Sequence, residues 1–235
     1  MNRSLFLFIL FLNFFIITGI SGACPDNSET FIFNLTQPDT LPQSQILYNG
    51  RVWQNLYYTV MGDQFLFSKV FLPGSLTIRG KSFKNVSIMY DLYKDEILTT
   101  VSPGGILQLN KEMVDSFAIL FQNKTYHFTR MSIDGLKGYY NVIYKGKTAL
   151  YVRYSKKIEK LAVEDTYDQF YQLTRIYYMK DNIAHLLTSK SDLKKVLVEE
   201  KELVKNFIKK NKLIISKENP ESFVTVIRYF DSIRK

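Results

Sequence analysis

Residues 139–154, YYNVIYKGKTALYVRY, decide the fold class of this 235-residue chain. Tyr140, Val142 and Tyr144 alternate with other residues before Gly146, and an equivalent alternation, Leu150, Val152 and Tyr154, follows it. A period of two on both sides of a glycine turn is typical of a β-hairpin, in which alternate side chains share a face. The stretch therefore predicts two antiparallel strands joined at residues 145–147.

Short apolar runs separated by turn residues continue in both directions, from Ile46 to Leu187. Alternation recurs in Leu76-Thr77-Ile78 and Val86-Ser87-Ile88, whose β-branched residues suit a pleated surface. No helical stretch between the runs is long enough for parallel crossovers. Residues 46–188 are thus predicted to form an antiparallel β domain, either a sandwich or a partly open barrel. Turns are expected at 49–50, 61–63, 73–74, 79–81, 103–105, 122–124, 134–135, 145–147 and 180–182.

After Thr188 the apolar period changes to about 3.6, which indicates helices. We expect one helix to begin near Ser191, a second at residues 201–210, and a third at Asn219-Pro220-Glu221, where a cap and a first-turn proline coincide. Short helices are unstable alone, so residues 189–235 should pack on the sheet as a basic helical segment. The predicted class is α+β. The lysines of this segment are residues 190, 194, 195, 201, 205, 209, 210, 212, 217 and 235.

Residues 1–23 have the three zones of an export signal. Arg3 is their only charged residue, an apolar run extends from Leu5 to Ile17, and small residues end at Ala23. A membrane span is the alternative, because the uncharged stretch could just cross a bilayer. The short apolar core and the glycines near its end favour a signal peptide cleaved between Ala23 and Cys24. Residues 24–45 are rich in polar residues and proline and are interpreted as a spacer.

Cys24 is the only cysteine, so it cannot form an internal disulfide. Gly22-Ala23-Cys24 resembles the lipobox of bacterial lipoproteins, although Ser21 stands where that motif usually carries leucine. Both a lipoprotein tethered to a membrane through Cys24 and a soluble secreted protein therefore remain open. Removal of residues 1–23 would change the formal charge of the chain from +9 to +8.

Three patches resemble a family of uncharacterised exported proteins of Bacteroidota: residues 47–53 (LYNGRVW), 90–96 (YDLYKDE) and 144–147 (YKGK). The ending TSKSDL at 188–193, followed by lysine-rich helices, is similar to the tails of these proteins. The resemblance implies the periplasm or outer membrane of a diderm bacterium, or secretion from it. It implies no activity, cofactor or catalytic residue.

The sequence gives little sign of catalytic chemistry. His127 and His185 are the only histidines, so no metal site is expected, and no cofactor-binding motif is present. Asp91, Asp95 and Glu96 could supply an acid and a base, as in glycosidases. In an extended strand, however, Asp91 and Asp95 would share a face about 13 Å apart, and Asp95 and Glu96 would face opposite sides. A turn near Lys94 could close this gap, and the interpretation we favour is that these carboxylates are the solvated ends of a hairpin.

The candidate ligand-binding residues are Arg51, Trp53, Asp91 and Asp95. Together with the basic tail they suggest an acidic envelope polymer or a protein as partner, and export argues against nucleic acid. We expect a non-enzymatic binding or scaffold module of the cell envelope. The alternative is a hydrolase of envelope polysaccharide or peptidoglycan that uses Asp91, Asp95, Glu96 and His127. A purely structural partner in an envelope complex is a third hypothesis.

Overall fold

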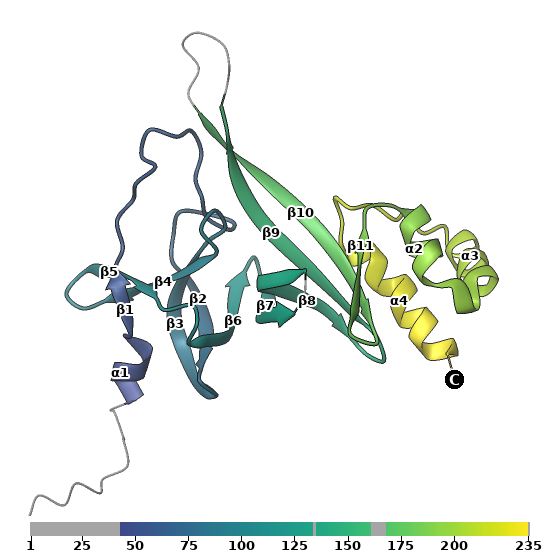
Figure 1. Ribbon diagram of the computed structural model, residues 1–235, viewed down its shortest axis with the longest axis horizontal. Coiled ribbons are helices and arrows are strands. Elements are labelled where there is room, and N and C mark those ends of the chain that lie inside the picture. The colour runs from purple at the N-terminus through teal and green to yellow at the C-terminus, as the bar shows by residue number, and fades with distance from the viewer. Residues whose placement is uncertain (1–42, 134, 161–167, 235) are drawn as a thin grey trace, which may run out of the picture. The chain divides into compact units, whose positions relative to one another are not determined.

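The computed structural model describes residues 43–133, 135–160 and 168–234, which contain eleven strands and several helices (Figure 1). Helix α1 spans Gln43–Leu47, within the region where a spacer and then a strand were predicted. The strands are β1 (Gly50–Val52), β2 (Leu72–Ile78), β3 (Lys81–Asp91), β4 (Glu96–Val101), β5 (Gly105–Leu109), β6 (Val114–Phe121), β7 (Lys124–Ile133), β8 (Leu136–Lys145), β9 (Ala149–Glu159), β10 (Gln169–Lys180) and β11 (Ile183–Leu187).

All eleven strands belong to one open antiparallel sheet in the order β1-β5-β4-β3-β2-β6-β7-β8-β9-β10-β11. The prediction of an antiparallel β-rich region followed by helices is therefore confirmed. A sandwich of two packed sheets is not, since a single sheet contains every described strand. The sheet curls back on itself. The backbone N–H of Lys156 in β9 donates a hydrogen bond to the carbonyl of Leu92, just after β3, at 3.1 Å, although several strands separate β3 from β9 in the sheet order.

The predicted hairpin at residues 139–154 consists of β8 and β9. Its register shifts between Val142, which pairs with Tyr151, and Tyr144, which pairs with Leu150. Such a bulge changes the face on which the following side chain lies. Tyr144 consequently packs against the same apolar cluster as Leu150, and the prediction that it shares a face with Tyr140 and Val142 is wrong.

The turn predicted at Pro73-Gly74 is also wrong, because both residues lie inside β2. Gly74 is needed there for close approach: a Cβ atom would come within 2.2 Å of the Ala118 carbonyl oxygen on β6 and 2.8 Å of Ile88 Cδ1 on β3. The chain irregularity at this point is a register shift between Gly74 and Leu76. The alternation predicted farther along this strand holds, since Leu76 and Ile78 are buried.

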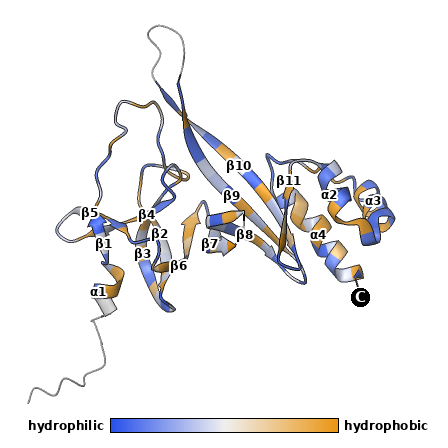
Figure 2. Ribbon diagram, in the orientation of Figure 1, coloured by the Kyte–Doolittle hydropathy of each residue, from blue (hydrophilic) through white to orange (hydrophobic). Residues whose placement is uncertain are grey.

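Two apolar clusters form the main cores. The first gathers residues of β2 to β8 around four aromatic rings, of which Phe117 and Phe128 stack with centroids 4.7 Å apart, and Tyr90 and Tyr139 meet edge to face. The second lies between β9 to β11 and the C-terminal helices, and it includes Leu150 and Phe230. The apolar faces of the short helices are thereby buried against the sheet (Figure 2).

The helices are α2 (Lys190–Val196), the 3-10 helix η1 (Val198–Glu200), α3 (Lys201–Lys210) and α4 (Glu221–Ile233). The predicted start near Ser191 is shifted by the cap: the Ser189 side chain accepts a hydrogen bond from the backbone N–H of Asp192 at 3.3 Å. The bounds of α3 agree with the prediction, and α4 follows Pro220 as expected.

Candidate functional site

A row of polar side chains lies on one face of β3, β4, β5 and β1. Asp91 pairs with Glu96 across β3 and β4, and Gln108 on β5 pairs with Arg51 on β1. Gln108 also pairs with Leu98, which lies two residues from Glu96. Directly paired residues, and residues two apart on one strand, point to the same face of a sheet. The four polar side chains are therefore neighbours on one surface, although they come from four strands.

A small third apolar cluster lies on this face beside the polar row. Phe65, Met89 and Leu98 are buried in it, and Trp53, Phe71 and Ile106 pack against it. The connection between β1 and β2 supplies Trp53, Phe65 and Phe71, and the rings of Trp53 and Phe65 have centroids 5.9 Å apart. Part of this sheet face is therefore covered by the connection, while the polar row borders open space.

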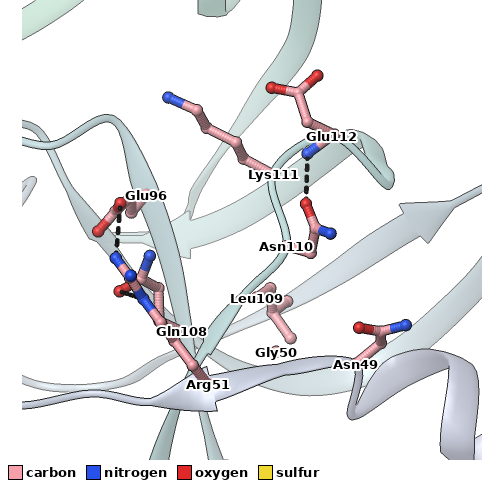
Figure 3. Close-up of a pocket in the computed structure, with 9 residues that line it drawn as sticks. All are labelled: Asn49, Gly50, Arg51, Glu96, Gln108, Leu109, Asn110, Lys111 and Glu112. Atoms are coloured by element: carbon pink, nitrogen blue, oxygen red, sulfur yellow. Dashed lines mark hydrogen bonds and ion pairs between the residues drawn. The ribbon is translucent and has the colours of Figure 1, made fainter.

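Two adjacent cavities open along the polar row, and we call them together the Arg51 groove. The first, of about 430 Å³, is shown in Figure 3. The second has a volume of about 410 Å³. They share Arg51, Glu96 and Gln108. The first is also lined by Asn49, Gly50 and residues 109–112, and the second by Val52, Trp53, Gln54, Leu56, Tyr57, Gln64, Asp91 and Lys94.

Arg51 stands where the two cavities meet. Its Nε donates a hydrogen bond to Gln108 Oε1 at 3.0 Å, and its guanidinium lies 3.7 Å from Glu96 Oε1 (Figure 3). The Arg51 side chain is exposed, whereas that of Glu96 is mostly covered. The remaining guanidinium N–H groups can therefore donate to a ligand that enters either cavity.

Asp91 is buried and fully engaged by the protein. Its Oδ1 accepts hydrogen bonds from the backbone N–H groups of Tyr93 at 2.8 Å and Lys94 at 2.9 Å, and its Oδ2 accepts one from Gln64 at 3.1 Å. Burial raises the pKa of Asp91, and these hydrogen bonds oppose the rise. Asp91 therefore holds the turn between β3 and β4 in place and has little capacity left for a ligand.

Glu96 is the carboxylate of the groove that retains capacity. Burial raises its pKa, the nearby charge of Asp91 adds to the rise, and Arg51 opposes it. Within the described residues, the carboxylate oxygens of Glu96 accept no hydrogen bond from the protein. Glu96 forms one ion pair, with the Arg51 guanidinium at 3.7 Å. A carboxylate held where its charge is disfavoured is typical of sites with a function, although structural ion pairs perturb pKa values as well.

Aromatic rings form one wall of the second cavity. The Tyr57 ring meets Tyr93 edge to face at 5.0 Å, and Lys94 Nζ lies 5.5 Å from the centroid of Tyr57. A hydrogen bond with Tyr57 is the largest cause of the raised pKa of Lys94. Trp53, half-buried, adds an indole with an N–H donor. The groove thus combines ring faces with both charges.

The structure brings three of the four sequence-predicted ligand residues together. Arg51, Trp53 and Asp91 line the second cavity, but Asp95 does not. The chain turns between β3 and β4, and Asp95 has a left-handed φ of 58°, so the turn considered near Lys94 is present and the extended arrangement is not. Glu96 therefore faces Asp91 directly, and Asp95 is directed elsewhere.

Asp95 belongs to a buried cluster beside a third cavity of about 390 Å³. Tyr90 Oη donates to Asp95 Oδ1 at 2.5 Å, and the Arg153 guanidinium lies 3.2 Å from Oδ2. Burial, followed by the charge of Asp95, raises the pKa of Tyr90 well above its usual range. This cluster joins the turn after β3 to β9, which makes Asp95 a structural residue rather than a member of the groove.

The remaining predicted residues do not join the groove. His127 is exposed on β7 and paired with Ala118, and His185 is exposed on β11. Ala23 and Cys24 lie outside the described residues. Gln108 was not singled out from the sequence; the only signal for it was the apolar-polar alternation of its segment.

Residues 43–133, 135–160 and 168–234 contain no group of three or more His, Cys, Asp or Glu side chains placed to hold a metal ion. Within the same ranges, none of the helices has the length and apolar character needed to span a bilayer.

Comparisons of the chain with protein-family models, with curated proteins and with solved structures found no match.

Proposed function

We propose that this chain is an exported envelope protein whose Arg51 groove binds a saccharide unit of an envelope polymer without cleaving it. The observation that carries the proposal is the shared position of Arg51, Glu96 and Gln108 between two cavities, with Trp53 and Tyr57 beside them. Sugars offer hydroxyl groups to charged and amide side chains and apolar ring faces to aromatic side chains. The groove supplies both kinds of partner within one surface.

Export and an envelope location are part of this proposal, and they rest on the sequence of residues 1–24 and on the resemblance to exported Bacteroidota proteins. The cavities are open and are lined by both polar and apolar side chains, which suits a ligand that is part of a longer polymer. An acidic sugar fits best, because exposed Arg51 has donors to spare while most acceptor sites of Asp91 are occupied by protein donors.

A hydrolase is the second candidate, and one observation favours it. Asp91 and Glu96 face each other across two strands in a cavity with aromatic walls, and the pKa of each is raised. Glycosidases use such pairs, one carboxyl as acid and one as base or nucleophile. The hydrogen bonds to Asp91 oppose this role, since Oδ1 accepts two and Oδ2 accepts one, which leaves about one acceptor site of the carboxylate for a proton, a water or a sugar.

The proposal is tested by cosedimentation of the purified protein with insoluble peptidoglycan and with insoluble acidic polysaccharide. Arg51→Ala and Trp53→Ala should each weaken binding about tenfold, as expected for a central side chain of a binding site. Arg228→Ala is the matched control, because Arg228 is exposed on α4 and its loss changes the charge equally. Equal binding by all these variants would refute a groove-based function.

The same mixtures distinguish the hydrolase. Release of soluble fragments that depends on Glu96, and stops in Glu96→Gln, would replace the binding proposal by the enzymatic one. Binding without fragment release, sensitive to Arg51 and Trp53, supports the binding module.

A further inference from the structure

The C-terminal helices present lysines that the described protein does not neutralise. Lys201, Lys205 and Lys209 are spaced by four residues along α3, so they lie on one side of the helix, and Lys210 and Lys212 follow at its end. Lys205 is paired with Glu202 at 3.3 Å. Among the ion pairs of the described residues, none involves Lys201, Lys209, Lys210 or Lys212.

Exposed apolar side chains accompany these lysines. Ile214, in the connection between α3 and α4, is 86% exposed, the largest value among the exposed large apolar residues of the described chain. Its neighbours Leu213 and Ile215 pack against the second core, so the alternation of the backbone directs Ile214 outward. Leu203 on α3 is 48% exposed. We call Lys201, Lys209, Lys210, Lys212 and Ile214 the tail surface.

The connection is held in this arrangement by backbone contacts. The N–H of Leu213 donates to the carbonyl of Ile208 at 3.0 Å, and the N–H of Lys212 donates to that of Lys209 at 3.2 Å. Lys212 itself has a left-handed φ of 51°. The chain therefore folds back over the end of α3, which sets Ile214 beside the lysines at that end. Figure 2 shows the hydrophilic residues that run along α3.

We infer that the tail surface docks on an anionic lipid surface. Unpaired lysines beside a protruding isoleucine match such a surface in two ways: the ammonium groups meet lipid headgroups, and the apolar side chain enters the boundary between headgroups and acyl chains. A soluble polyanion would satisfy the lysines alone and would leave Ile214 exposed to water. This inference does not depend on the Arg51 groove or on acylation of Cys24.

The test measures sedimentation with vesicles of phosphatidylcholine and with vesicles in which about one third of the lipid is phosphatidylglycerol. Every protein is expressed with its native leader and carries Cys24→Ser, so that no acyl chain contributes and the N-terminal segment is the same throughout. The tail variant replaces Lys201, Lys209, Lys210 and Lys212 by Gln. The control variant replaces Lys69, Lys81, Lys84 and Lys145 by Gln; these lysines are exposed, lie outside the tail, and are in no ion pair of the described chain.

The parent protein should bind the anionic vesicles and not the neutral ones, and binding should weaken steeply with salt. Each lysine near an anionic surface contributes about fivefold in affinity, so loss of four lysines should weaken binding of the tail variant by about several hundredfold, and the control variant should lose far less. Ile214→Ser should lower vesicle affinity several-fold without changing binding to soluble polyglutamate. Circular dichroism checks that each variant is folded.

Three results would overturn the inference. The first is absence of binding to anionic vesicles by the parent protein. The second is an equal loss of vesicle affinity in the tail and control variants, which would show that net charge alone explains the binding. The third is full vesicle binding by Ile214→Ser together with tight polyglutamate binding, which would assign the tail surface to a soluble polyanion.

Discussion

Asp231 on α4 and Thr148 in the turn between β8 and β9 are joined by two hydrogen bonds. Thr148 Oγ1 donates to Asp231 Oδ1 at 2.9 Å, and the Thr148 backbone N–H donates to Oδ2 at 3.0 Å. Tyr144 Oη donates to the same Oδ2 at 3.0 Å. Asp231 is buried, so a single carboxylate ties the last helix to the hairpin that decided the fold class.

Asp231→Ala should lower the free energy of unfolding by about 2–4 kcal/mol, because it leaves the buried Thr148 donors without a partner. The control is Thr225→Ala, at an exposed position of the same helix, which should change stability by less than about 0.5 kcal/mol. Chemical denaturation measures both. A loss at Asp231 no larger than that at Thr225 would show that α4 is held by apolar packing alone.

Gly138→Ala should destabilise the protein more than Gly80→Ala, which replaces a glycine in a turn. A Cβ atom at Gly138 would come within 2.1 Å of both Arg153 Nη1 and Asp95 Oδ2, and the residue has a φ of +104°. Gly80 also has a positive φ, +75°, but a Cβ there would meet nothing within 4 Å. A side chain on a residue with positive φ costs about 1–2 kcal/mol through backbone strain alone. At Gly138, displacement of the ion pair between Asp95 and Arg153 adds to this cost.

Thermal melts of Gly138→Ala and Gly80→Ala separate the two causes. Gly138→Ala should cost at least about 1 kcal/mol more than Gly80→Ala. If the two variants melt together, the contact between Asp95 and Arg153 contributes nothing measurable to joining β8 and β9 to the turn after β3.

Much of the fold could be predicted because it is encoded locally. The hairpin at residues 139–154 and helix α3 are set by the periods of apolar residues and by glycine. The candidate site could not be predicted in the same way, because Arg51 and Gln108 lie 57 residues apart and meet only through strand register. The turn after Asp91 contains no glycine or proline, and the Asp91 side chain itself holds it. The sequence therefore marked Asp91 and Glu96 as candidate acid and base residues, but it did not predict that they pair directly across β3 and β4.

Glu96→Gln should stabilise the protein at neutral pH by about 1 kcal/mol or less and should lose this advantage in acid. Burial raises the pKa of Glu96 above its usual value of 4.5. The folded chain then binds the proton more tightly than the unfolded chain, so charged Glu96 reduces stability as the pH rises through the folded pKa. Gln carries no charge at any pH and avoids this penalty.

The measurement is the difference in melting temperature between Glu96→Gln and the parent protein from about pH 4 to pH 7. The difference should grow with pH. A difference that shrinks toward neutral pH would mean that the attraction of Arg51 outweighs the cost of burial at Glu96.

Cys24→Ser should release the protein from membranes, because the only thiol lies at the expected cleavage site and acyl chains on it would be the anchor. Each buried methylene contributes about 0.8 kcal/mol, so loss of two or three chains removes the anchor completely. Fractionation at high salt is the measurement, since salt weakens any electrostatic contribution of the tail surface and leaves an acyl anchor intact. The intact mass of the purified protein gives the cleavage position and acylation together. A mature mass without acyl groups would leave the soluble secreted form. Unchanged membrane association of Cys24→Ser at high salt would rule out the acyl anchor and favour an uncleaved membrane span in residues 1–23.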